Sequence, residues 1–244
     1  MPTPMRRPTG HNAGMSEPSA FDRGRFTDHL RHVVEPIWAA QHAHPFVRGI
    51  GDGSLEMEKF AFWLAQDYLF LIDYARLFAT AVLRAPDLAS MTTFSRLLYE
   101  TLGREMELHR SYCAEFGISP ADLERTTKAP TTQGYTDFLL RTATTNNYTE
   151  LLGALLPCMW GYNEVGTTLA RRGLPTDDRY RRWINVYADP EFAELAMWCR
   201  TLLDDASQNL STDRANRVER AFITSSRYEL AFWDMAWRQE TWLA

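Results

Sequence analysis

Apolar residues recur along this chain at the three- and four-residue spacing of an α-helix, in long segments separated by glycine and proline clusters. No run of alternating apolar and polar residues, internal repeat or low-complexity tract follows residue 18. The fold class is therefore predicted to be all-α, with a single bundle-like domain over residues 19–244. The spacing predicts helices over residues 21–43, 54–84, 87–116, 132–145, 148–172, 176–188, 190–207 and 212–241.

Three predicted helices carry polar side chains within their apolar faces. The second helix is apolar nearly all round, which is typical of a central buried helix, yet Asp67 lies in its main stripe. Glu229 lies in the apolar stripe of the last helix. The fifth helix contains an internal proline, Pro157, directly before Cys158, and Tyr162 follows one turn later. These stripes bring carboxylates, a thiol and a phenol into the interior, where a charge must be neutralised or hydrogen-bonded.

Each of these residues also has an ordinary structural explanation. A free cysteine such as Cys158 is often a small apolar side chain, and Tyr135 or Tyr162 could lie at the edge of the core. Asp67 could form a structural salt bridge with an arginine, and Glu229 could bind a backbone donor at a helix kink. Their occurrence together favours a functional site, because the core of a helical bundle normally contains few polar groups.

Composition and charge exclude several classes of protein. The net charge of −5 provides no basic surface for nucleic acid or anionic lipid. The most apolar segment, residues 60–83, is interrupted by charged and amide side chains, so we do not expect a membrane span. The three cysteines contain no Cys-x-x-Cys pair, which favours a reducing compartment over a disulfide framework or a zinc ribbon. We therefore expect a cytoplasmic protein.

The first 18 residues are rich in proline, threonine, serine and glycine and contain no apolar run. We expect residues 1–18 to form a disordered extension, because a secretion signal would need a hydrophobic segment after Arg6 and Arg7. Translation could start at either Met1 or Met15.

The sequence does not match the ligand pattern of a di-metal helical bundle, which uses Glu-x-x-His pairs on two helices. Glu105 and His109 are four residues apart and are interpreted as neighbours on one helix face. Glycine-rich phosphate and dinucleotide loops are also absent from the sequence. We expect no metal and no cofactor; the alternative is a haem site that uses His29 or His32.

Four motifs occur in order along the chain: WLAQDY at residues 63–68, LLPCMWGYNEVG at 155–166, WINVY at 183–187 and ELAFWDMAW at 229–237. Together they resemble the TenA, or thiaminase II, family, which is related in fold to haem oxygenase. The resemblance extends over roughly residues 20–241. It implies a helical bundle of the haem-oxygenase-like type that assembles as a homotetramer.

The resemblance implies a pocket for an aminopyrimidine inside the bundle. Cys158 corresponds to the family's catalytic nucleophile, and Glu229 to the acidic residue that handles protons beside it. Asp67 corresponds to the carboxylate that recognises the amidine-like edge of the pyrimidine. Phe70 falls where some members carry tyrosine, so an apolar contact is expected there. The phenols that line the pocket correspond to Tyr135, Tyr162 and Tyr187.

The activity implied by the resemblance is that of an aminopyrimidine aminohydrolase, or thiaminase II, of the cysteine-bearing branch. The expected reaction converts 4-amino-5-aminomethyl-2-methylpyrimidine to 4-amino-5-hydroxymethyl-2-methylpyrimidine in thiamine salvage, with thiamine as a further candidate substrate. Two alternatives are a regulatory, pyrimidine-binding protein, since the family has carried a transcription-activator label, and a haem-oxygenase-like oxidase. The absence of a basic helix argues against direct DNA contact.

The implied roles suggest how the thiol reacts. Addition of a thiol to the pyrimidine ring breaks the aromaticity and lets the substituent on the methylene group depart, which divides one difficult step into easier ones. A neighbouring carboxylate raises the pKa of a thiol. We therefore expect Cys158 to rest as a thiol, with Glu229 removing its proton during the attack.

Overall fold

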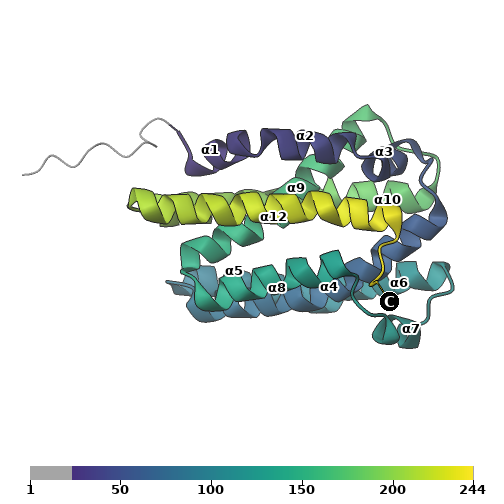
Figure 1. Ribbon diagram of the computed structural model, residues 1–244, viewed down its shortest axis with the longest axis horizontal. Helices are drawn as coiled ribbons and strands as arrows, with labels where there is room; N and C mark the ends of the chain where they lie inside the picture. Colours follow the sequence, from purple (N-terminus) through teal and green to yellow (C-terminus); the bar gives the residue numbers. More distant parts are fainter. Residues whose placement is uncertain (1–23, 244) are drawn as a thin grey trace, which may run out of the picture.

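The structure, a computed structural model, describes residues 24–243, and these fold almost entirely into helices (Figure 1). No strand occurs within this part of the chain, which confirms the predicted all-α class. The disordered extension predicted over residues 1–18 lies outside the described residues. The helices are α1 (Phe26–Val33), α2 (Glu35–Ala43), α3 (Pro45–Asp52), α4 (Met57–Arg84), α5 (Leu88–Glu100), the π-helical segment η1 (Thr101–Glu105), α6 (Met106–Glu115), α7 (Pro120–Arg125), α8 (Pro130–Thr145), α9 (Tyr148–Arg172), α10 (Asp178–Tyr187), α11 (Pro190–Ser207) and α12 (Thr212–Arg238).

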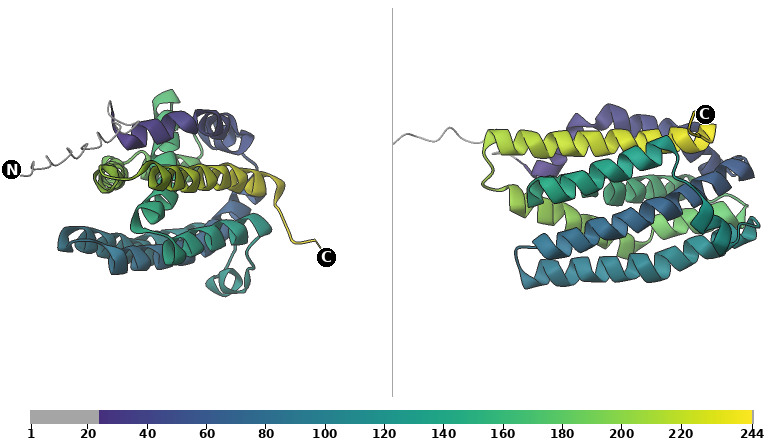
Figure 2. Two further views of the ribbon diagram at one scale, coloured as in Figure 1. Left: turned by 60° about the vertical axis from the view of Figure 1, so that its left-hand side comes forward. Right: turned by 60° about the horizontal axis from the view of Figure 1, so that its bottom comes forward.

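The long helices pack in layers with their axes roughly aligned (Figures 1 and 2). α9 and α12 lie between α1 and α2 on one side and α4, α5 and α8 on the other. α9 contacts α8, α10, α11 and α12, so it holds a central position. Gly153 permits the close approach of α9 and α12, because a Cβ atom there would lie 2.8 Å from Val218 Cγ1.

α4 is buried along most of its length, as predicted for a central helix. Its buried side chains include Asp67 and Asp73. Asp73 forms salt bridges with Arg76 and Lys128, whereas Asp67 faces a cavity described below. Although α4 is long and largely apolar, no helix within residues 24–243 has the length and hydrophobicity needed to cross a membrane.

Most predicted helix boundaries agree with the structure. The ranges 148–172 and 190–207 coincide with α9 and α11. The single helix predicted over 21–43 is wrong, because α1 and α2 are separate helices that meet at Val34. Pro36 in the first turn of α2 lacks the N–H group that would continue α1.

The segment from Pro45 to Gly53 was expected to separate two helices, but it forms a helix of its own, α3. Proline fits the first helical turn, where its missing N–H group is not needed. The His44 ring caps the helix by accepting a hydrogen bond from the Phe46 N–H group (3.2 Å). Gly53 ends it with a φ of 79°, a left-handed conformation that favours glycine.

The helix predicted over 87–116 is interrupted near its middle. α5 ends at Glu100, and η1 follows as five π-helical residues before α6 begins at Met106. Such π-helical turns are often found at functional sites. η1 ends at Glu105, which borders the cavity.

Candidate active site

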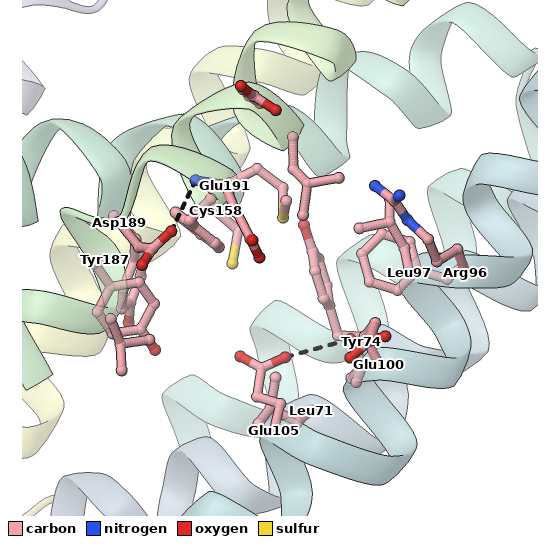
Figure 3. A pocket seen from close by; sticks show the side chains of 18 of the residues that line it. Leu71, Tyr74, Arg96, Leu97, Glu100, Glu105, Cys158, Tyr187, Asp189 and Glu191 are labelled. Carbon is pink, nitrogen blue, oxygen red and sulfur yellow. Dashed lines mark hydrogen bonds between the residues drawn. The ribbon is translucent and has the colours of Figure 1, made fainter.

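A cavity of about 1190 Å³ lies between α4, α5, η1, α6, α9 and the region where α10 meets α11. Figure 3 shows Cys158, Tyr187 and Glu105 directed into it from different walls. Two predicted site residues, Tyr135 and Glu229, lie outside the lining but interact with residues that form it. The other predicted residues line the cavity: Asp67, Phe70, Cys158, Tyr162 and Tyr187.

The turn of α9 that precedes the cavity thiol has irregular hydrogen bonding. Pro157 has no N–H group, so the carbonyl four residues earlier loses its usual helical donor. Side chains from two other helices bind the next two carbonyl groups. Ser225 Oγ donates to Ala154 O (2.7 Å), and Tyr74 Oη donates to Leu155 O (3.0 Å). These hydrogen bonds tie the turn that presents the thiol to α12 and α4.

Cys158 differs from the other cysteines of the chain. Cys113 and Cys199 are buried, whereas Cys158 is partly exposed and lines the cavity. Burial against the cavity wall raises the pKa of the Cys158 thiol well above its ordinary value of 9.0, and the charges of Glu229 and Asp67 raise it further. These surroundings favour the thiol over the thiolate at neutral pH.

Glu229 is buried on α12, where its hydrogen-bond partner is a phenol rather than the backbone donor considered above. Tyr135 Oη lies 2.5 Å from Glu229 Oε1. Burial raises the pKa of Glu229 to about 8; the hydrogen bonds with Tyr135 and Cys158 lower it, and the charge of Asp67 raises it. At neutral pH most of this carboxyl group is therefore protonated, and the carboxylate that could accept a thiol proton is the minor form.

Asp67 is paired with a histidine, so the alternative of an arginine partner is wrong. His109 Nε2 lies 2.6 Å from Asp67 Oδ2, and both side chains are buried. His109 Nδ1 donates to the carbonyl oxygen of Glu105 (3.0 Å), because a carbonyl oxygen can only accept. Burial lowers the pKa of His109, but the hydrogen bond with Asp67 and its charge raise the pKa above the ordinary value. Asp67 therefore favours the protonated form of His109.

Glu105 was predicted only to share a helix face with His109, but it is also a cavity residue. The two are linked through the Glu105 backbone, while the carboxylate accepts a hydrogen bond from Thr101 Oγ1 (3.3 Å; Figure 3). Burial raises the pKa of Glu105 to about 7; the charge of His109 lowers it and that of Asp67 raises it. The helical spacing of the sequence does not reveal the π-helical turn that ends at Glu105.

Aromatic rings surround the thiol and the carboxylates. The Phe70 ring centroid lies 5.1 Å from that of Tyr135 and 5.3 Å from that of Tyr74. Tyr162 and Tyr187 form a second pair, with centroids 4.9 Å apart. Rings arranged in this way can hold a flat aromatic ligand through stacking and edge contacts.

The outer part of the cavity is strongly acidic. Its charged side chains come from α5, α6 and the start of α11. Because α11 is far from α5 and α6 in the sequence, the sequence alone does not show that these side chains share one surface. An acidic surface of this kind favours positively charged ligands. The charged residues of this outer part are Arg96, Glu100, Glu107, Asp189, Glu191 and Glu194.

The histidines considered as haem ligands lie elsewhere in the bundle. His29 Nε2 is 2.7 Å from Glu219 Oε2, and neither His29 nor His32 lines the cavity. Within residues 24–243, no group of three histidine, cysteine or acidic side chains is arranged to hold a metal ion.

Comparison with known proteins matches residues 31–239 to the TENA/THI-4/PQQC family. The chain belongs to this family. An aminopyrimidine aminohydrolase from Halalkalibacterium halodurans is 47% identical over 220 residues, which cover 89% of this chain and 97% of that protein. The resemblance inferred from the four sequence motifs is therefore confirmed.

Solved structures of this family share the fold. A TenA homologue from P. horikoshii OT3 is 33% identical, with a TM-score of 0.81 and coverage of 88% of this chain and 99% of that chain. A domain of unknown function with a haem-oxygenase-like fold, from Shewanella denitrificans OS217, is 17% identical with a TM-score of 0.68, over 87% of this chain and 92% of that chain. These likenesses confirm the predicted haem-oxygenase-like fold.

Proposed function

We propose that this protein is an aminopyrimidine aminohydrolase. It converts 4-amino-5-aminomethyl-2-methylpyrimidine and water to 4-amino-5-hydroxymethyl-2-methylpyrimidine and ammonia, a reaction of thiamine salvage. The observation that carries the proposal is the arrangement of three side chains from three helices: Asp67 and Cys158 line one cavity, and Glu229, outside the lining, forms a hydrogen bond with Cys158. The H. halodurans relative, which has this activity in its name, aligns with most of the chain.

Asp67 and the aromatic walls recognise the pyrimidine in this proposal. One carboxylate oxygen, Oδ2, is held by His109, which leaves Oδ1 to accept hydrogen bonds from the amino group and from the protonated ring nitrogen at the amidine-like edge. Phe70 and the Tyr162–Tyr187 pair contact the ring. The acidic outer part of the cavity suits a cationic leaving group, either the ammonium form of the aminomethyl group or the thiazolium of thiamine, which is the proposed second substrate.

Cys158 supplies the nucleophile, and Glu229 transfers protons. The carboxylate form of Glu229 takes the thiol proton and passes it to a ring nitrogen as the bond between Sγ and a ring carbon forms. The amine, in its ammonium form, then leaves as ammonia with its bonding electrons. Water adds to the methylene carbon and returns one proton to the Cys158 sulfur. The sulfur–carbon bond breaks as Glu229 takes the added proton from the ring nitrogen, so the ring becomes aromatic again. The released ammonia accepts this proton, which returns Glu229 to its carboxylate form.

The proposal is tested by incubating the purified protein with the aminomethylpyrimidine and, separately, with thiamine. We expect hydroxymethylpyrimidine and ammonia in equal amounts from the first substrate. Binding of both compounds without turnover would contradict the proposal and support the pyrimidine-binding alternative. An absorption spectrum with haem bands would support the oxidase alternative instead.

We further propose that the chain forms a homo-oligomer, a tetramer by its family resemblance, through the outer face of α5 and η1. Leu88, Met91, Ser95, Tyr99 and Leu102 follow the three- and four-residue spacing of a helix-packing stripe. Leu88 is 76% exposed and Tyr99 is 75% exposed. A second copy of α5 would cover such a stripe.

Light scattering after size-exclusion chromatography tests this assembly. Leu88→Glu combined with Tyr99→Glu is expected to reduce the oligomer to smaller species, whereas the matched charge change Arg214→Glu, on the exposed start of α12, is not. A wild-type protein that elutes as a monomer would contradict the assembly.

We also propose a cytoplasmic location. The three cysteines are free, which suits a reducing compartment. Fractionation of cells that express the chain at its native level tests this location, and recovery outside the cytoplasm would contradict it.

A further inference from the structure

A chain of buried hydroxyl groups links Glu229 to the helical turn that carries Cys158. Tyr135 Oη lies 2.5 Å from Glu229 Oε1 and 2.9 Å from Ser225 Oγ. Ser225 Oγ in turn lies 2.7 Å from the carbonyl oxygen of Ala154. Glu229, Tyr135 and Ser225 are each at most 2% exposed, so the chain is isolated from solvent.

The number of protons available to this chain of hydroxyl groups determines whether it fits the protonated or the ionised form of Glu229. Each of the three oxygen–oxygen contacts needs one proton, and the Ala154 carbonyl has none to give. Tyr135 and Ser225 supply one each, so two protons cannot satisfy three contacts. When Glu229 is protonated, it donates to Tyr135, Tyr135 donates to Ser225, and Ser225 donates to Ala154. Every contact then contains a proton.

When Glu229 is ionised, one contact in this chain of hydroxyl groups lacks a proton. Tyr135 would donate to the carboxylate, and Ser225 would still donate to the Ala154 carbonyl. The 2.9 Å contact between Tyr135 and Ser225 would then bring two oxygen atoms together without a proton between them. A buried polar contact of this kind carries an energetic penalty. Ser225 therefore competes with Glu229 for the Tyr135 proton.

We propose that Ser225 is a positioning residue for the acid: by accepting the Tyr135 proton, it frees the Tyr135 oxygen to accept the proton of an un-ionised Glu229. Ser225 lies one helical turn before Glu229 on α12. Its own hydrogen bond ends at the Ala154 carbonyl, in the turn of α9 before Cys158. The chain ends at a carbonyl, which cannot pass a proton on, so it holds the Glu229 proton rather than conducting it to solvent.

The other titratable groups around Glu229 do not favour its ionised form through charge. α4 contributes Asp67 and Tyr74, α8 contributes Tyr135, and α9 contributes Cys158 and Tyr162. All of these groups are neutral or negative, and none can supply a positive charge to the Glu229 carboxylate. The charge around Glu229 therefore acts in the same direction as burial, and Ser225 limits how far the Tyr135 hydroxyl opposes them.

The role of Ser225 deepens the proposed function, but its test is independent of turnover. Infrared difference spectra of the full chain, recorded against pH, follow the C=O stretch of a protonated carboxyl group, and Glu229→Gln identifies the Glu229 band. In the wild type we expect this band at neutral pH. In Ser225→Ala the band is expected to disappear at a pH lower by about 1, because Tyr135 is then free to donate to the carboxylate.

The neighbouring Ser226 provides a matched control. It is equally buried, and its hydroxyl accepts a hydrogen bond from Trp38 Nε1 (3.1 Å), so Ser226→Ala also removes a buried hydroxyl partner. We expect the Glu229 band to titrate as in the wild type in Ser226→Ala, and Ser225→Thr to retain the wild-type titration. Circular dichroism melting shows that each variant is folded.

Two results would overturn the role of Ser225. One is a wild-type protein that lacks the Glu229 carboxyl band at neutral pH. The other is a Ser225→Ala variant, folded by circular dichroism, in which the band titrates at the wild-type pH. If Ser225→Ala does not fold, Ser225→Val provides the same loss of hydroxyl while filling the space. A protein without hydrolase activity would contradict the proposed function, but these spectra would still test the role of Ser225.

Discussion

His109 Nε2 lies 2.6 Å from Asp67 Oδ2, so a buried histidine holds the carboxylate that faces the cavity. The histidine is itself anchored, because its Nδ1 donates to the Glu105 carbonyl oxygen. Asp67 is thus oriented before any ligand arrives, with Oδ1 left for the proposed contact with the pyrimidine. Orientation in advance of binding lowers the entropy lost when a ligand binds.

Asp67→Asn is expected to reduce kcat/KM by about 10- to 150-fold, because a hydrogen bond to a charged group contributes about 1.5–3 kcal/mol. Steady-state kinetics measure this loss, and thermal melting measures stability. Asp73→Asn is the matched control, since Asp73 is buried on the same helix but pairs with Lys128 and Arg76. It should change kcat/KM little, so the comparison separates ligand recognition from the loss of a buried carboxylate. An Asp67→Asn protein that unfolds easily but retains normal activity when folded would instead support a structural role.

Cys158 should react with iodoacetamide only slowly at neutral pH. Burial raises the pKa of its thiol above 9.0, and the reactive thiolate therefore forms only at higher pH. The measurement is the rate of alkylation against pH in Cys113→Ala combined with Cys199→Ala, which leaves a single thiol. Ionisation of Cys158 well below its ordinary pKa of 9.0 would show that a thiolate is preformed.

Gly166→Ala is expected to destabilise the protein, although alanine normally favours a helix by about 1 kcal/mol. A Cβ atom at this position would lie 2.7 Å from the Tyr187 backbone and Cβ, so α10 must move. We expect a loss of about 1–3 kcal/mol in the free energy of unfolding, and a higher KM because Tyr187 lines the cavity. Gly161→Ala is the control, because its nearest neighbour, Trp38 Cζ2, lies at an ordinary 3.9 Å. Similar unfolding curves for the two variants would contradict the expected clash.

Glu164 makes a pH-dependent contribution to stability. Burial alone would raise its pKa, but hydrogen bonds from His42 and Arg31 outweigh it and lower the pKa from 4.5 to about 2. A carboxyl group with a lowered pKa stabilises the fold above pH 4.5, and this contribution is lost as the pH falls toward 2. Urea unfolding at several pH values should therefore show a smaller acid-induced loss in Glu164→Gln than in the wild type. Identical pH dependence would refute the contribution.

Helical periodicity predicts most of the fold, because most helices bury a continuous apolar face and end at proline or glycine. α9 and α11 agree with prediction for this reason. Periodicity does not predict α3, because a segment with a proline and three glycines is typical of a break between helices, although proline also fits the first turn of a helix. The π-helical turn from Thr101 to Glu105 has no local sequence signal, since tertiary packing selects it over a regular helix.

The candidate site, like the fold, could be predicted from the sequence only in part. Inward stripes indicated that Asp67 and Glu229 face the interior, and family motifs suggested their roles. Their partners could not be predicted, because His109 is 42 residues from Asp67 in the sequence and Tyr135 is 94 residues from Glu229. Periodicity shows which face of a helix is buried, but only the packed structure shows which side chains meet.

The most direct test of the proposed active site compares Cys158→Ala with Cys199→Ala. Both variants remove one thiol, but only Cys158 lines the cavity, whereas Cys199 is buried on α11. The measurement is the rate at which each protein releases hydroxymethylpyrimidine from the aminomethylpyrimidine and from thiamine. We expect no product above the uncatalysed background from Cys158→Ala, and near wild-type rates from Cys199→Ala. Equal rates in Cys158→Ala and the wild type would contradict the assignment of the nucleophile.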